Sequence, residues 1–133
     1  MSDLVITNLL AFGSFFATAV VMLLAFLAIY IRVTPYNELT LIREGNTAAA
    51  VSLGGAVIGF ALPIAVAVAV SHNLYVMLAW GLVASLVQLL TLIAARLALP
   101  RLNESIPQGK LAAGVLLASL AIGVGILNAG CIV

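Results

Sequence analysis

Several polar side chains stand inside long apolar stretches, where an amide or hydroxyl group must either pair with the protein or line a path for a polar solute. In the second half of the chain they include Ser85, Gln88, Thr91 and Asn128. The first three recur at every third residue, so a helix would carry them on one loosely shared face. A glutamine in hydrocarbon is destabilising unless its amide finds a partner. The spacing therefore indicates either hydrogen bonds between helices or the lining of a pore in an oligomer.

Small residues recur at every fourth position in two of the apolar stretches. The first series is Gly55, Gly59 and Pro63, and the second is Ala121, Gly125 and Ala129. Such spacing lets two helix backbones approach closely, so we expect these residues to pack helices together within a bundle or between subunits. A second interpretation stays open. Pro63 cannot donate to the carbonyl of Gly59, which leaves that carbonyl free to form part of a hinge or a permeation path.

Cationic side chains stand at the edges of the apolar stretches. They are Arg32, Arg43, Arg96, Arg101 and Lys110. Long cationic side chains at the end of a membrane helix reach along the apolar surface towards the lipid phosphates. We expect these residues to anchor the protein at the membrane interface in this way.

Residue types that catalysis needs are scarce. The apolar stretches contain no acidic residue and no lysine, so a carboxylate relay inside the membrane is unsupported. A single histidine, His72, excludes paired axial imidazoles for a haem within one chain, and a single cysteine, Cys131, excludes an intrachain disulfide. We therefore expect no enzyme activity and no catalytic, cofactor or metal site. The net charge of +1 gives no reason to expect a nucleic-acid partner.

The composition identifies the elements that carry these residues. Hydrophobic residues make up 65% of the 133 positions and charged residues only 7%, whereas soluble domains carry roughly 25% charged residues. Asp, Glu, Lys and Arg are absent from residues 4–31, 45–95 and 111–133, and a membrane helix needs about 20 residues. The continuous apolar runs predict an all-α polytopic membrane protein with four transmembrane helices. The predicted spans are 6–31, 46–70, 74–99 and 109–133.

The five cationic residues all fall in or beside two connections, between the first and second spans and between the third and fourth. Cytoplasmic connections of membrane proteins carry the excess of Lys and Arg. Both connections are therefore expected in the cytoplasm, and both termini outside it. Pro35 is expected to end the first helix, and Leu39, Leu41 and Ile42 favour a short interfacial helix after it.

The two halves of the chain share a pattern when one is shifted by 64 residues. The matched pairs include Phe16 and Trp80, Arg32 and Arg96, Gly45 and Gly109, and Gly59 and Gly123. Each half holds two spans, so the halves share one orientation in the membrane, as parallel repeats do. The sequence predicts two tandem helical hairpins, residues 1–70 and 71–133.

Several short motifs follow one another along the chain. They are Thr34-Pro35-Tyr36-Asn37-Glu38, Leu41-Ile42-Arg43-Glu44-Gly45-Asn46-Thr47-Ala48-Ala49, Ala79-Trp80-Gly81, Gln88-Leu89-Leu90 and Asn128-Ala129-Gly130-Cys131. In this order they resemble the YjfL family of bacterial inner-membrane proteins over essentially the whole chain. The resemblance implies a bacterial cytoplasmic (inner) membrane location, a tandem membrane repeat and an association with envelope stress. It brings no established activity and no catalytic residue.

Two functions fit these features, and a third stays open. The first expectation is a small oligomeric channel for ions or small polar solutes, because charge-free spans with one polar face suit a weakly selective pore. The alternative is a non-catalytic scaffold or adaptor in envelope-stress response, which would hold a cytoplasmic partner through residues 35–45 and 100–110. The third is a subunit that stabilises a larger membrane complex. In each case membrane lipid surrounds the protein, and a homo-oligomer is expected.

Overall fold

Four long helices form most of the protein in a computed structural model, which describes residues 2–132. They are α1 (Ser2–Val33), α3 (Thr47–Val70), α4 (Leu74–Ala98) and α6 (Leu111–Ile132). Each is long and apolar enough to cross a membrane, so the predicted all-α fold with four membrane-spanning helices is confirmed. α1 starts before the predicted position, since Asp3 in its first turn suits the positive end of the helix dipole. Residue 1, which begins the first predicted repeat, and residue 133, which ends the second, lie outside the described residues.

Two short helices lie in the connections. They are α2 (Glu38–Arg43) and α5 (Leu102–Ser105). Asn37 caps α2 by accepting a hydrogen bond from the Thr40 amide at 3.1 Å, and Asn46 caps α3 by accepting one from the Ala49 amide at 3.0 Å. These caps satisfy amide groups that a helix start leaves free, so they define where each helix begins. The short helix expected in the first connection is therefore present as α2.

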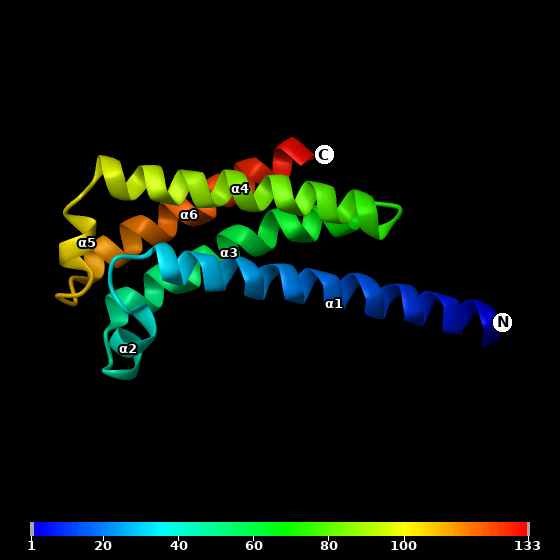
Figure 1. Ribbon diagram of the computed structural model, residues 1–133, viewed down its shortest axis with the longest axis horizontal. Coiled ribbons are helices and arrows are strands. Elements are labelled where there is room, and N and C mark those ends of the chain that lie inside the picture. The colour runs from blue at the N-terminus through cyan, green and yellow to red at the C-terminus, as the bar shows by residue number, and fades with distance from the viewer. Residues whose placement is uncertain (1, 133) are drawn as a thin grey trace.

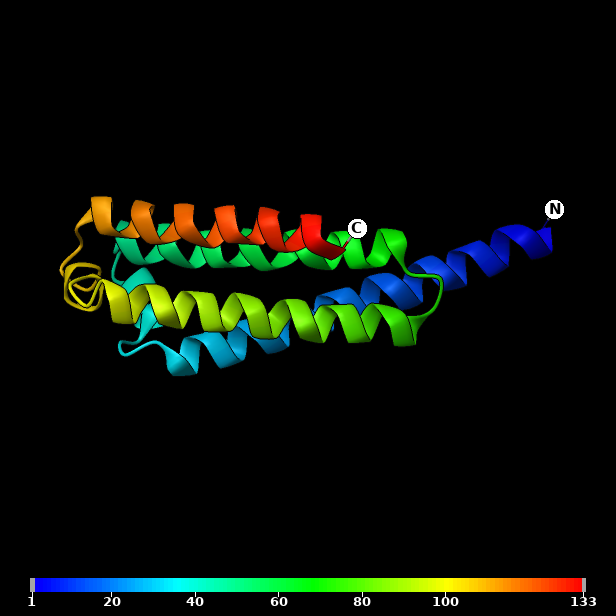
Figure 2. The ribbon, with the colours of Figure 1, turned by 90° about the horizontal axis from the view of Figure 1, so that it is seen from above.

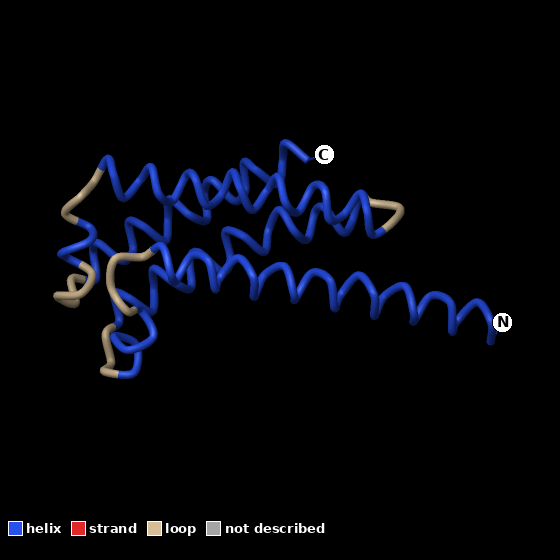
Figure 3. Tube along the Cα trace, viewed as in Figure 1, coloured by secondary structure: helices blue, strands red, loops and turns tan. Residues whose placement is uncertain are grey.

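The bundle has two different ends (Figures 1 and 2). One end, here called the connector end, carries α2, α5 and the loops beside them. The other, called the turn end, carries the turn between α3 and α4, and the start of α1 and the end of α6 point towards it. The segments outside the helices lie at these two ends (Figure 3). Consequently α3 and α6 run from the connector end to the turn end, whereas α1 and α4 run the opposite way.

The element bounds follow the 64-residue shift of the sequence. α2 and α5 begin at residues 38 and 102, and α3 and α6 begin at residues 47 and 111, so both pairs are 64 apart. Gly45 and Gly109, which precede α3 and α6, have φ angles of +87° and +80°. Glycine adopts such angles without a steric penalty. The division into tandem hairpins stays a prediction, and these bounds accord with it.

α3 and α6 pack closely along their length and lie side by side along one side of the bundle (Figure 2). A Cβ atom added at Gly55 would collide with Ala118, and one added at Gly59 would collide with the carbonyl group of Ala121. A Cβ atom at Gly125 would collide with the backbone of Gly59. Lipid supplies no hydrophobic drive between helices, so such close backbone contact supplies the attraction through dispersion.

α1 packs on the bundle mainly through the half that lies near the connector end. Phe26 stacks on Phe60 of α3 with ring centroids 4.2 Å apart, and Met22 fills the space beside Gly81 of α4. Towards the turn end α1 diverges from the other helices and extends beyond them (Figure 1). The helix is therefore held firmly at one end and exposes most of its side chains at the other.

Candidate functional site

A cluster of buried and half-buried polar groups lies at the connector end. The cluster, called the connector cluster, comprises Tyr30, Tyr36, Glu38, Arg96 and Asn103. Arg96, near the end of α4, donates from Nη2 to the hydroxyl oxygens of Tyr30 at 2.9 Å and Tyr36 at 3.1 Å. Its Nη1 donates to Oδ1 of Asn103 at 2.9 Å. One guanidinium, with five donors in a rigid plane, thus joins α1, the loop before α2, and α5.

Glu38 supplies the charge opposite to that of Arg96. Its Oε1 lies 3.6 Å from Nη2 of Arg96, and its side chain is fully buried. Neither carboxylate oxygen accepts a hydrogen bond from the residues that the structure describes. Burial disfavours the charged form, and Arg96 opposes this effect only in part, so the pKa of Glu38 rises from 4.5 to about 7. This carboxyl group can therefore change its charge near neutral pH.

Two aromatic rings flank the guanidinium. Arg96 Cζ lies 5.7 Å from the ring centroid of Tyr30 and 5.2 Å from that of Tyr36, within the range of cation–π attraction. Burial also raises the pKa of the Tyr36 hydroxyl, so that it stays a neutral acceptor for Arg96. The rings and hydroxyl groups together replace much of the water that a guanidinium would otherwise need.

Arg96 departs from the expectation that it anchors the protein at lipid phosphates. It is only 6% exposed and points into the connector cluster, because a carboxylate and three neutral acceptors within reach satisfy its charge inside the protein. The other four residues of that group have exposed side chains, as an interface role requires. They are Arg32, Arg43, Arg101 and Lys110.

A second contact joins the two connections directly. Asn46 Nδ2 donates to the carbonyl oxygens of Ile106 at 2.9 Å and Pro107 at 3.2 Å, while its Oδ1 caps α3. Together with the bond from Arg96 to Asn103, this contact holds the two connections in one arrangement. The unit formed by residues 34–46 and 99–110 is called the connector platform below.

Gln88 and Asn128 form hydrogen bonds between α4 and α6. Gln88 Nε2 donates to the carbonyl oxygen of Ala121 at 2.8 Å, and Asn128 Nδ2 donates to that of Ala84 at 3.1 Å. Gln88 is fully buried and Asn128 is 9% exposed. Of the two roles predicted for these amides, the structure contains the interhelical one.

The two hydroxyl residues of the predicted polar face behave differently. Ser85 donates to the carbonyl oxygen of Gly81 at 2.6 Å, and Thr91 donates to that of Val87 at 2.8 Å, so each bonds within α4. Such bonds satisfy a hydroxyl group without a partner helix. Ser85 also borders a shallow groove between α1 and α4. The predicted face is therefore divided between the interior of the bundle and its surface.

The six small residues of the two series are all buried between helices. They are Gly55, Gly59, Pro63, Ala121, Gly125 and Ala129. The carbonyl group of Gly59, which Pro63 leaves without its helical donor, lies against Gly125 of α6. The carbonyl group for which the sequence allowed a role in a hinge or a permeation path is therefore covered by packing within one chain.

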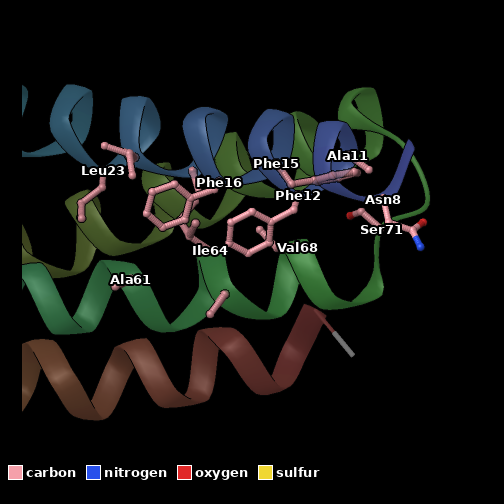
Figure 4. A pocket seen from close by; sticks show the side chains of 13 residues that line it. Asn8, Ala11, Phe12, Phe15, Phe16, Leu23, Ala61, Ile64, Val68 and Ser71 are labelled. Carbon is pink, nitrogen blue, oxygen red and sulfur yellow. The ribbon is translucent and has the colours of Figure 1, made fainter. Parts of the chain in front are cut away.

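An open apolar groove lies between the turn-end half of α1 and α3 (Figure 4). Its volume is about 630 Å³. Phe12, Phe15 and Phe16 line one side, and Ile64 and Val68 line the other. The groove is a consequence of the divergence of α1, and it opens sideways to the surroundings of the bundle.

The sequence patterns did not predict the connector cluster, although the sequence contains one signal for it. Glu38 stands 64 residues before Leu102, and Leu102 is buried at 5% exposure. An acidic residue at a position whose counterpart is an apolar, inward-facing residue indicates a buried carboxyl group that needs a partner. The matching arginine could then have been sought at the end of α4.

Comparison with known proteins gives the family. The model of the Domain of Unknown Function (DUF350) family matches residues 3–132. The chain is 37% identical over 127 residues to the UPF0719 inner membrane protein YjfL of Escherichia coli (strain K12), covering 96% of each chain. It is 27% identical over 128 residues to the UPF0719 transmembrane protein YshE of Bacillus subtilis (strain 168), covering 95% of this chain and 94% of that one. No solved structure matches the chain.

These relatives share nearly the full length of the chain, and their printed names agree with the four membrane-spanning helices. The resemblance to the YjfL family inferred from the ordered motifs is confirmed. This integral membrane protein, whose connector cluster joins both halves of the chain, belongs to the DUF350 family.

Proposed function

We propose that this protein is a non-catalytic inner-membrane scaffold that holds a partner protein on its connector platform. The observation that supports this proposal is the contact of Arg96 with Tyr30, Tyr36, Glu38 and Asn103. A buried ion pair adds little net stability compared with apolar groups of the same volume, so its value lies in fixing one geometry. Here the fixed geometry is that of the two segments outside the membrane.

The surface of the connector platform suits a small protein interface. Its exposed charged residues are Arg43, Glu44, Arg101, Glu104 and Lys110. They surround short helices that also expose Leu39 at 47%. Charged residues around an apolar contact point are the usual arrangement of a compact interface with a polar rim. The partner is expected to carry both charge signs, since the platform does.

We expect the platform to lie in the cytoplasm, because it and the helix ends beside it hold all five Lys and Arg residues. The inner-membrane location follows the printed name of the relative YjfL. To test the orientation, single cysteines are introduced at Leu39 and at His72 in a Cys131→Ser chain. In intact cells, an impermeant maleimide is expected to label position 72 and to leave position 39 unlabelled. The reverse pattern would invert the topology.

The partner is tested by photo-crosslinking in living cells, with and without envelope stress. A crosslinking amino acid replaces Leu39 or Arg101 on the platform, and Tyr75 at the turn end serves as a control with 85% exposure. The same protein is expected to be captured from both platform positions and not from position 75. Capture from neither platform position, with the full chain folded in the membrane, would contradict the scaffold.

A channel in a homo-oligomer is the second candidate. One observation favours it: Oε1 of Gln88 is buried between helices and accepts no hydrogen bond within residues 2–132. A buried amide oxygen of this kind is commonly satisfied by water, which would need a path from the membrane surface. Purified protein in liposomes would then pass ions or small solutes, and Gln88→Leu would reduce the flux while Thr91→Val would not. Liposomes that stay tight under voltage, pH and osmotic gradients would exclude this candidate.

A further inference from the structure

The apolar groove beside α1 is lined by two polar residues, and both lie at the same end of it. Asn8 of α1 and Ser71 in the turn lie together at the turn end of the groove, beyond the phenylalanine side chains (Figure 4). The hydroxyl oxygen Oγ of Ser71 is buried and has no hydrogen-bond partner in the part of the chain that the structure describes. A buried polar atom of this kind calls for a ligand or a water molecule that can pair with it.

The length and depth of the groove match those of one membrane leaflet. Its lining on α1 runs from Asn8 to Leu23, which corresponds to about 22 Å at 1.5 Å per residue. A bilayer is about 40–45 Å thick with its headgroup regions, or about 20–22 Å for each leaflet, of which about 15 Å is hydrocarbon. The groove therefore begins near the membrane surface at the turn end and passes through the leaflet beneath it.

The volume of the groove suits a small amphiphilic ligand. The groove offers about 630 Å³, a size typical of sites for small amphiphilic ligands. Its Phe12, Phe15 and Phe16 side chains present apolar surface to whatever lies there.

We propose that this groove binds one acyl chain of a phospholipid from the leaflet at the turn end, with Ser71 and Asn8 meeting the ester groups of the lipid. The bound chain fills the space between α1 and α3 that protein side chains leave open. Polarity matches at both levels, because the apolar walls lie at the depth of the hydrocarbon and the two polar groups lie at the depth of the esters. This inference does not rest on the scaffold function.

The test uses the full chain, reconstituted with a phosphatidylethanolamine and phosphatidylglycerol mixture and then transferred to mild detergent for native mass spectrometry. The wild type is expected to retain one phospholipid per chain. Ala65→Trp places a large side chain in the groove and is expected to remove that lipid. Ser71→Ala removes the polar contact and is expected to raise lipid release at least severalfold. Helix content by circular dichroism checks that each variant is folded.

The matched control is Ala25→Trp, which fills the smaller groove of about 280 Å³ between α1 and α4. This variant is expected to keep the lipid. Equal retention in Ala65→Trp and Ala25→Trp, or no retained lipid on folded wild type, would overturn the proposal. A dimer that only Ala65→Trp dissociates would also overturn it, since a second copy would then be the occupant.

Discussion

The two halves of the chain follow one backbone plan but differ at its connector end. Arg32 and Arg96 stand 64 residues apart at the ends of α1 and α4. Arg32 is exposed, whereas Arg96 is buried against Glu38 and two tyrosines. Among the residues that the structure describes, only the second arginine lies beside a carboxylate, because the counterpart of Glu38 in the second half is Leu102. The plan thus yields one polar cluster, to which each half contributes different residues.

The same asymmetry continues into the bundle. Gly59 packs against the backbone of α6, whereas its counterpart Gly123 has no described atom within 4 Å of the position of a Cβ. Gln88 bonds to α6 from α4, and its counterpart Leu24 is 59% exposed. α3 and α6 therefore meet through surfaces that are not equivalent. A shared backbone plan fixes where helices start, but single residues decide which face is buried.

The sharpest test of this comparison replaces the two arginines. Above about pH 7, where Glu38 is mostly ionised, Arg96→Met leaves this fully buried carboxylate without its counter-charge, and removing one partner of a buried ion pair costs about 3–5 kcal/mol. Arg32→Met alters an exposed side chain and is expected to change the free energy of unfolding by less than about 0.5 kcal/mol. Unfolding by dodecyl sulfate in mixed micelles measures both. Equal losses would mean that the halves are equivalent after all.

The next largest effect is expected at the paired glycines. Gly59→Leu forces α3 away from α6, because the new side chain meets the backbone carbonyl of Ala121, and overpacking of this kind costs about 1–3 kcal/mol. Gly123→Leu adds the same side chain where space is open and serves as the matched control. The same unfolding assay separates them. Destabilisation by Gly123→Leu alone would place the contact on the opposite face of α6.

The pH dependence should follow Glu38. Its pKa is raised to about 7 in the folded protein from 4.5, so its stabilising contribution is fully present below about pH 4.5 and is lost as the pH rises through about 7. The free energy of unfolding is therefore expected to fall between pH 5 and pH 8, on the order of 1–2 kcal/mol. Glu38→Gln should flatten this dependence, whereas Glu104→Gln, at an exposed position, should preserve it. A profile that Glu38→Gln leaves unchanged would assign the titration to another group.

The sequence sufficed for the four spans because their signal is compositional. Long stretches without charge determine the number of helices. Residues that end or cap a helix, such as Pro35 and Asn46, determine where the helices approximately end and begin. The inward faces of α3 and α6 could also be predicted, since Gly and Ala at every fourth position indicate close helix contact. These signals are local, and a single chain without relatives displays them.

The connector cluster and the groove depend on contacts that local patterns do not record. Arg96 resembles an interface anchor in its own helix, and only the position of Glu38, far away in the sequence, draws it inward. The groove arises because α1 diverges from α3, and periodicity along α1 gives no hint of that angle. The polar spacing of Ser85 and Gln88 suggested one shared face, but the orientation of α4 divides it.

The smallest expected effect concerns the interhelical amide. Gln88→Leu copies the residue at position 24 of the first half and removes the bond to the Ala121 carbonyl. Hydrogen bonds between membrane helices contribute about 0.6 kcal/mol on average and about 1.7 at most, so a loss within this range is expected in the unfolding assay. Thr91→Val, which deletes a bond within α4, should change less. Stabilisation by Gln88→Leu would show that the buried amide is kept at the expense of stability. That result would support a role for the unpartnered Oε1 in a solute path, because a function would then be needed to explain the glutamine.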